Sequence, residues 1–167
     1  MSQYSVPKIP PPVLVAATLV AQRLITRNSR SIPVAKVASG AIATASVGLA
    51  LWAETAFIAA KTSSNPMHPE RTSVLIVSGA NAVSRNPMYL GMVGVAFAHG
   101  VWHGSARALV PAVALALWLD MLQIPAEEAF LAQRFGPDYE HYRQAVPRWL
   151  AVPENLIWRV SHDRFRV

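Results

Sequence analysis

The sequence predicts an all-α membrane protein: a multi-pass bundle of about four spans, with five as an alternative, and a C-terminal helical segment beside the membrane. Apolar residues make up 53% of the 167 residues and charged residues only 14%, against about 25% charged in typical soluble domains. The stretches 37–53 and 86–106 contain no charged residue. Because long apolar runs without charge are typical of membrane-crossing helices, we expect residues 1–167 to form a single integral-membrane domain.

The predicted spans cover residues 13–25, 34–60, 87–101 and 106–124. The first is shorter than the roughly 20 residues that a helix needs to cross a bilayer, and a signal peptide is the alternative. The proline run before it and Gln22-Arg23 near its end fit a short or tilted helix better. In the second span, Gly40, Thr44 and Gly48 recur every four residues. This spacing favours close approach of another helix, although chance in an alanine-rich helix explains it equally well.

The segments outside the spans are richer in turn signals and charges. Residues 61–85 contain Asn-Pro and further prolines, which predict a loop, with a short β-rich run at Ser73–Val77. Pro87 suits the first position of the third helix, where its missing N–H is not needed. The polar C-terminal segment 126–167 contains predicted helical pieces at 126–135 and 138–145 and an interfacial helix at 154–167.

Composition and missing motifs exclude several function classes. The chain has no cysteine, which excludes disulfides, thiolate zinc sites and a cysteine nucleophile. We assign its net charge of +6 to orientation signals and anionic-lipid contacts rather than to nucleic-acid binding. The glycines form neither G-x-G-x-x-G nor a P-loop. His99 and His103 could share a helix face, but no third ligand lies near them in sequence, so no metal site is predicted.

Polar residues gather where the fourth span meets the C-terminal segment. Asp120, Gln123 and Glu127 would share one face if that helix continues past Pro125. Ionisable groups at membrane depth are costly and tend to face a cavity. The alternative is that Glu127 and Glu128 only favour the positive end of a helix that begins after Pro125. A pocket between the third span, the fourth span and the C-terminal segment would use these residues together.

The runs from Ser78 to Gly91 and from Glu127 to Trp149 form two blocks that resemble the isoprenylcysteine carboxyl methyltransferase and phospholipid methyltransferase superfamily. The run from Ser78 to Gly91 resembles its S-G-x-Y-x-x-x-R-[HN]-P-x-Y-x-G signature. The run from Glu127 to Trp149 resembles its E-E-x-x-L…F-G-x-x-Y-x-x-Y…R-W signature. Asn65-Pro66…Pro69 resembles the upstream loop of the family, so that the resemblance covers roughly residues 62–150.

The resemblance implies an integral-membrane methyltransferase that uses S-adenosylmethionine without a Rossmann domain. The cofactor would lie between the last membrane helices and the C-terminal segment, and a lipophilic substrate would enter from the bilayer. Implied cofactor contacts are Leu75, Ile76, Asn86, Pro87, Met88, Tyr89, Glu127, Tyr139 and Arg148. The implied catalytic positions are Arg85, Glu128 and Tyr142, and substrate binding is placed at Asp120 and Gln123.

The residue types suit these roles. A carboxylate at Glu127 can accept hydrogen bonds from the cofactor and favours a cationic sulfonium. The guanidinium of Arg85 or Arg148 can bind the cofactor's carboxylate in a fork geometry that lysine lacks. If the methyl acceptor must lose a proton, the candidate bases are Glu128, Asp120 and His141.

Two positions depart from the family pattern. Asn81 stands where the signature usually has tyrosine, which puts one cofactor contact in doubt. Gln123 stands one turn before Glu127, where the prenylcysteine enzymes have an arginine for the substrate carboxylate. An amine, thiol or other lipophilic acceptor is therefore expected in preference to a prenylcysteine carboxylate.

Two other function classes stay open at the level of sequence. A membrane reductase related to sterol reductases would need basic groups around the phosphates of a nicotinamide cofactor, for which Arg134, Arg143 and Arg148 are candidates. A non-catalytic membrane scaffold would explain the departures at Asn81 and Gln123. Counting basic residues on each side favours an orientation with both termini and the active site in the cytoplasm. The expected location is a bacterial cytoplasmic membrane. Its partners would be membrane lipids and a lipophilic substrate, and the oligomeric state is left open.

Overall fold

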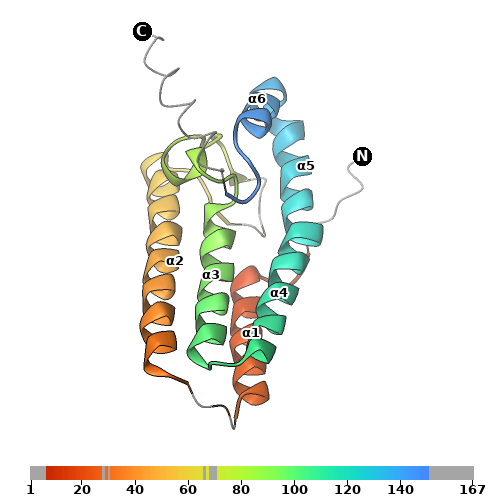
Figure 1. Ribbon diagram of the computed structural model, residues 1–167. Helices are drawn as coiled ribbons and strands as arrows, with labels where there is room; N and C mark the ends of the chain where they lie inside the picture. Colours follow the sequence, from red (N-terminus) through yellow and green to blue (C-terminus); the bar gives the residue numbers. More distant parts are fainter. Residues whose placement is uncertain (1–6, 28, 30, 66, 68–70, 151–167) are drawn as a thin grey trace.

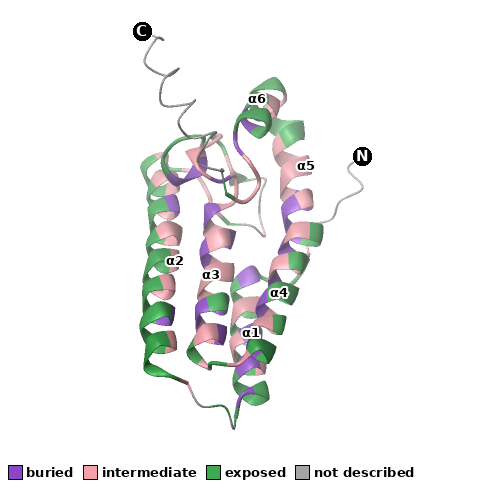
Figure 2. Ribbon diagram, in the orientation of Figure 1, coloured by how far each residue is buried: buried purple, intermediate pink, exposed green. Residues whose placement is uncertain are grey.

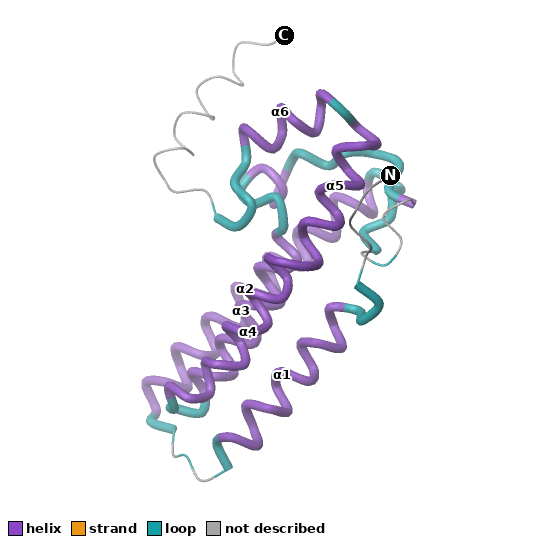
Figure 3. Tube along the Cα trace, turned by 90° about the vertical axis from the view of Figure 1, so that its right-hand side faces the viewer, coloured by secondary structure: helices purple, strands orange, loops and turns teal. Residues whose placement is uncertain are grey.

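The chain is a bundle of helices in a computed structural model that describes residues 7–27, 29, 31–65, 67 and 71–150 (Figure 1). Every regular element in that part is helical (Figure 3), which confirms the predicted all-α class. The α-helices are α1 (Pro11–Ile25), α2 (Pro33–Ala59), α3 (Pro87–Trp102), α4 (Leu109–Trp118), α5 (Ile124–Phe135) and α6 (Pro137–Ala145). The shorter elements are two 3-10 helices, η2 (Gly79–Ala82) and η3 (Ala106–Ala108), and the π-helical turn η4 (Leu119–Gln123).

The helices α1, α2 and α3 lie side by side with the helix that α4 and α5 form together (Figures 1 and 3). α2 packs along α3, and α1 packs against α3 and α4. The buried interior contains small side chains such as Ala53, Ala96 and Ala112, whereas Val37 and Leu117 are exposed. Figure 2 shows exposed residues along much of α2. This inside-out pattern, with large apolar side chains on the outer surface, suits a bundle surrounded by lipid.

Two helices are long and apolar enough to cross a membrane by themselves. They are Pro33–Ala59, with 27 residues, and the continuous helix Ala106–Phe135, with 30 residues. α1 has 15 residues and α3 has 16, which is short of the roughly 20 residues of a full span. The predicted number of about four spans therefore stays a prediction.

The fourth predicted span does not end at residue 124. α4, η4 and α5 instead form one continuous helix, so the amphipathic stretch predicted as a separate piece at 126–135 extends the span. A proline inside a helix lacks the N–H that would bond the fourth preceding carbonyl and clashes with it. The wider π turn directly before Pro125 changes this local geometry, and such turns are a known way to accommodate a helix irregularity.

The connecting and terminal segments differ in part from their predictions. Ser73–Val77 forms no strand but runs without regular structure to η2. The predicted helical piece at 138–145 is present as α6. The interfacial helix predicted at 154–167 lies outside the described residues.

The close helix contact is made by different glycines from those predicted. Gly40, Thr44 and Gly48 lie on an exposed face of α2, and a Cβ atom added at Gly40 or Gly48 would meet nothing within 4 Å. A Cβ atom on Gly91 would instead lie 2.6 Å from the Ser46 carbonyl oxygen. α3 therefore approaches α2 through its own glycines, and no described residue packs closely on Gly40 or Gly48.

This contact makes a matched pair of glycine variants informative. Gly91→Leu should lower the free energy of unfolding by about 1–3 kcal/mol, because a side chain has no space against α2. Gly48→Leu is the control and should leave stability unchanged or slightly raised, because its surroundings are open. Thermal unfolding in detergent, followed by circular dichroism, measures both. Equal unfolding midpoints for the two variants would contradict the packing of α3 on α2.

Candidate functional site

A cavity of about 280 Å³ lies at the end of the bundle where the 61–85 connection, the start of α3, α5 and α6 meet. Its volume is at the lower end of the roughly 300–1,000 Å³ typical of small-molecule sites. Most of the predicted site residues line it: Leu75, Ile76, Arg85, Asn86, Pro87, Met88, Tyr89, Glu127, Glu128, Tyr139 and Tyr142. The fold thus gathers residues from both signature blocks around one space.

Three predicted site residues do not line this cavity. Gln123 is fully buried beneath it and donates a hydrogen bond from Nε2 to Glu127 Oε1 at 2.6 Å. Asp120 and Arg148 are bound to each other, with Asp120 Oδ1 and Arg148 Nη1 3.1 Å apart. The expected common face of Asp120, Gln123 and Glu127 is therefore divided. Gln123 and Glu127 face α3, while Asp120, within the π turn, faces the C-terminal segment.

Glu127 is held by two uncharged donors. The Tyr89 hydroxyl donates to Glu127 Oε1, and the Gln123 amide donates to the same oxygen. Tyr89 is available here because α3 begins at Pro87, which places its first turn over the cavity. None of the ion pairs among the described residues involves Glu127. This carboxylate thus lies on the cavity without a cationic partner from the described part of the chain.

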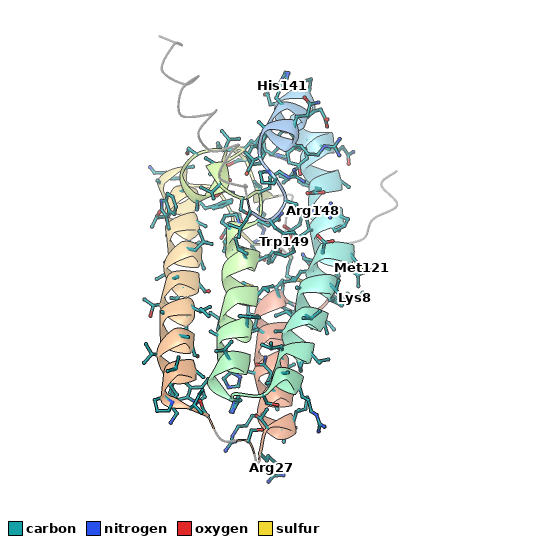
Figure 4. The ribbon with its side chains drawn as sticks, viewed as in Figure 1. Lys8, Arg27, Met121, His141, Arg148 and Trp149 are labelled. Atoms are coloured by element: carbon teal, nitrogen blue, oxygen red, sulfur yellow. The ribbon has the colours of Figure 1, made fainter. Side chains whose placement is uncertain are left out.

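Glu128, the next residue, is held by two arginines. Arg85 Nη2 lies 2.6 Å from Glu128 Oε1, and Arg148 Nη2 lies 2.6 Å from Glu128 Oε2. The Arg148 side chain also reaches Asp120, whose carboxylate accepts a 2.9 Å hydrogen bond from Trp149 Nε1. In Figure 4, Arg148 and Trp149 lie between α3 and α5. The hydrogen bonds that Arg148 donates to Glu128 raise the pKa of its guanidinium, which keeps the pair charged.

The same arginine that precedes α3 also fixes the chain after α6. Arg85 Nη1 donates to the carbonyl oxygens of Arg143 and Val146, at 2.9 and 2.8 Å. Its backbone N–H donates to the Pro147 carbonyl oxygen at 2.9 Å. The segment after α6 is therefore attached to the start of α3, beside the cavity-lining part of α6.

The two predicted tyrosines are structural neighbours in α6. Tyr142 donates from its hydroxyl to the backbone carbonyl of Asn81 at 2.7 Å, so this hydroxyl holds η2 in place. Tyr139 is almost fully buried, and burial raises the pKa of its hydroxyl. Their rings pack edge to face with centroids 6.2 Å apart. Both tyrosines line the cavity, and the contact from Tyr142 argues for a positioning role there.

Two buried polar atoms beside the cavity have no hydrogen-bond partner among the described residues: Asn81 Oδ1 and Arg85 Nε. Leaving such a group unsatisfied costs about 1–3 kcal/mol. One is an acceptor and the other a donor, and both residues line the cavity. A ligand that offers an N–H group and an anionic oxygen would satisfy the pair. The sequence drew attention to Asn81 only as a departure from the signature.

Several lining residues were not predicted. They come from the ends of α1 and α2 and from the connection before η2: Pro12, Phe57, Ser63, Ser64, Thr72 and Val74. Met92 and Leu131 add apolar wall from α3 and α5. Nothing in a single sequence reports that the start of α1 and the end of α2 reach the same cavity as α5. The sequence placed Phe57 in a predicted apolar span and the residues between 61 and 85 in a predicted loop, without indicating a common cavity.

Because Glu128 neutralises two arginines, its replacement should destabilise the fold. Glu128→Gln should lower the free energy of unfolding by about 3 kcal/mol, since it leaves the largely buried guanidinium of Arg85 without its counter-charge and Arg148 with Asp120 as its remaining acid. Glu140→Gln removes an exposed acid that pairs with Arg143 and should leave the unfolding midpoint unchanged. Thermal unfolding of both variants in detergent is the measurement. A Glu128→Gln protein as stable as Glu140→Gln would show that these ion pairs do not hold the C-terminal segment.

Comparison with known proteins places the chain in a family. The sequence model of the family described as phospholipid methyltransferase matches residues 34–138. An uncharacterized protein of Haemophilus influenzae is 35% identical over 63 residues, which is 38% of this chain and 100% of that relative. No solved structure matches the chain. Because the family match covers more than half of the chain and includes most of the cavity, the protein belongs to the phospholipid methyltransferase family, a family of membrane methyltransferases.

Proposed function

We propose that the protein transfers a methyl group from S-adenosylmethionine to a lipophilic acceptor that reaches the cavity from the bilayer. The observation that carries this proposal is the environment of Glu127. A carboxylate that lines an apolar cavity and contacts only neutral donors favours a cationic ligand, and the reactive sulfur of S-adenosylmethionine is cationic. Both arginines near the cavity are bound to Glu128 and leave this charge uncompensated.

The other polar atoms beside the cavity fit the same cofactor. S-adenosylmethionine carries ammonium and adenine amino groups that can donate to Asn81 Oδ1. It also carries a carboxylate that can accept from Arg85 Nε. Asn81 Oδ1 and Arg85 Nε are the two buried polar atoms beside the cavity that have no hydrogen-bond partner among the described residues. Arg148, which the resemblance placed at the cofactor, contacts Glu128 and Asp120 instead, so we assign it to positioning of the wall.

The protein's contribution to the reaction is alignment and exclusion of water. When bound, S-adenosylmethionine supplies an electrophilic methyl group on a positively charged sulfur. Apolar side chains such as Met88, Met92 and Leu131 line the cavity and keep water from the reacting atoms. Glu127 holds the cation in one place, and correct alignment of the acceptor supplies much of the acceleration that such a transfer needs.

The structure favours Glu127 among the acids that could take a proton from the acceptor. Glu128 and Asp120 are both bound by arginine. His141 lies in the middle of α6, is exposed and is at the outer end of the molecule, away from the bundle (Figure 4). Glu127 lines the cavity and has only neutral donors on its carboxylate. For an acceptor that loses a proton, we propose Glu127 as the base.

The acceptor we propose is an amine or a thiol on a lipophilic molecule. Gln123 is neutral, fully buried and bonded to Glu127, so it offers no charge for an acceptor carboxylate. Pro12 is exposed and lines the cavity together with Phe57. The cavity therefore reaches the outer surface near α1 and α2, where a membrane-dissolved molecule could enter.

Cofactor binding tests the role of Glu127. Glu127→Gln should raise the dissociation constant for S-adenosylmethionine about 10- to 100-fold, because the variant loses the negative charge that favours the cationic ligand, and a hydrogen bond to a charged group is worth roughly 1.5–3 kcal/mol. Isothermal titration calorimetry in detergent measures it, with Glu140→Gln as a matched control at an exposed site. Wild-type affinity in Glu127→Gln would remove this carboxylate from the cofactor site. Binding of NADPH in preference to S-adenosylmethionine would favour a reductase.

The acceptor class can be tested with labelled cofactor. The protein in lipid nanodiscs should transfer the labelled methyl group to amine- or thiol-bearing lipophilic molecules and not to the carboxylate of a prenylcysteine. The reason is that neutral Gln123 stands where that carboxylate would need a cation. Thin-layer separation of the extracted products gives the readout. Preferential methylation of the prenylcysteine carboxylate would contradict this assignment.

A further inference from the structure

A second pocket lies at the opposite end of the bundle from the proposed cofactor cavity. It is formed by the end of α1, the connection to α2, the start of α2 and the end of α3, and has a volume of about 530 Å³. Its lining includes Arg23, Ser31, Lys36, His99, Trp102 and His103. None of the described residues that line it is acidic. Figure 4 shows Arg27 at this same end of the molecule, far from His141.

The floor of the pocket is held by a buried glutamine. Gln22 is fully buried, and its Nε2 donates to the carbonyl oxygens of Ala96 and Ala108 at 2.9 and 2.7 Å. This fixes the amide orientation, so Gln22 Oε1 must accept the 2.8 Å hydrogen bond from His99 Nδ1. A side chain of α1 thereby sets the orientation of a ring on α3 that lines the pocket.

The two histidines are engaged with each other. With its proton on Nδ1, neutral His99 can only accept at Nε2, and His103 Nε2 lies 3.3 Å from it. The rings meet edge to face, with centroids 4.6 Å apart. Arg23 and Lys36 line the same pocket and would repel a metal cation. The histidine pair therefore forms a floor of fixed orientation, and the permanent positive charge of the pocket comes from Arg23 and Lys36.

The described lining of the pocket carries two cations, Arg23 and Lys36, and no acidic residue. This charge favours binding of an anion. Lys36 Nζ lies 5.7 Å from the centroid of the Trp102 ring, which keeps the ammonium group over the pocket. Arg23 presents a planar set of donors that suits phosphate oxygens, and the Ser31 side chain offers a hydroxyl. The chemistry of the lining thus matches a phosphate group.

The surroundings indicate that this phosphate belongs to a lipid. Ile25, Ile32 and Val37 flank the pocket in sequence at the ends of α1 and α2, and each is exposed by half or more. A free phosphate has no use for such an apolar rim, whereas acyl chains would cover it. A tryptophan at the end of an apolar helix is also typical of the membrane–water interface. We propose that this pocket binds the phosphate of an anionic phospholipid in the leaflet opposite the cofactor cavity.

Charge removal inside and outside the pocket tests this site. The variant carries Arg23→Gln and Lys36→Gln. The matched control carries Arg27→Gln and Arg107→Gln, which removes the same charge at the same end from residues outside the lining. Native mass spectrometry of the detergent-solubilised protein, titrated with dioleoyl phosphatidylglycerol, gives the affinity for the first bound lipid. The affinity should fall about 30-fold in the pocket variant. Each of the two basic residues contributes about 1 kcal/mol, or roughly fivefold in affinity.

Each outcome decides for or against the site. The control variant should bind the first phosphatidylglycerol with wild-type affinity, and equal losses in both variants would overturn the proposal in favour of diffuse surface charge. Inorganic phosphate should not displace the lipid, and displacement at equal concentration would mean a free-phosphate site. Zwitterionic phosphatidylcholine that binds as tightly as phosphatidylglycerol would also overturn it. All four substituted side chains are exposed, and unchanged thermal unfolding of both variants verifies that they fold.

Discussion

The end of the bundle that contains the proposed cofactor cavity depends on one carboxylate, Glu128, which is held between Arg85 and Arg148. Arg85 precedes α3, Glu128 lies on α5, and Arg148 follows α6, so three separate segments meet at two 2.6 Å ion pairs. Asp120 completes the cluster as the second acid against the two arginines, which makes the group neutral overall. Charges in a poorly hydrated site are costly unless each is paired and hydrogen-bonded. The segment after α6 therefore has one favourable position, which holds α6 and its lining residues Tyr139 and Tyr142 at the cavity.

The two adjacent acids do different work because neighbouring residues on a helix point in different directions. Glu128 faces the arginines, while Glu127 faces Tyr89 and the cavity. Arg85 and Arg148 are thus neutralised by Glu128 and Asp120. Glu127 is left with hydrogen bonds from the neutral donors Tyr89 and Gln123. The structural ion pairs and the proposed cation site are in this way parts of one arrangement.

Much of the fold could be predicted from the sequence because its helices are long apolar runs with proline at their starts. The bounds of α2 and α3 follow from hydropathy and from Pro33 and Pro87. The continuity of α4 and α5 could not be predicted, since Pro125 is a stop signal unless a π turn precedes it, and such turns have no clear sequence pattern. Which glycines pack was equally hidden, because Gly48 and Gly91 differ only in what lies opposite them.

The site shows the same division between what the chain encodes locally and what the fold adds. The signature blocks led to Tyr89 and Glu127, and the fold brings both to one cavity. The role of Arg148 could not be predicted, since its partner is decided by a contact across the fold rather than by residue type. Phe57 was missed because nothing local distinguishes it from other apolar residues of α2.

The central claim is that the cavity beside Glu127 holds S-adenosylmethionine. Native mass spectrometry of the purified wild-type protein, incubated with equal concentrations of S-adenosylmethionine and NADPH, tests it most directly because the bound mass identifies the ligand. The structure and the family predict one bound S-adenosylmethionine, or its demethylated product, per chain, and no bound NADPH. Retention of NADPH, or of neither molecule, would contradict the account.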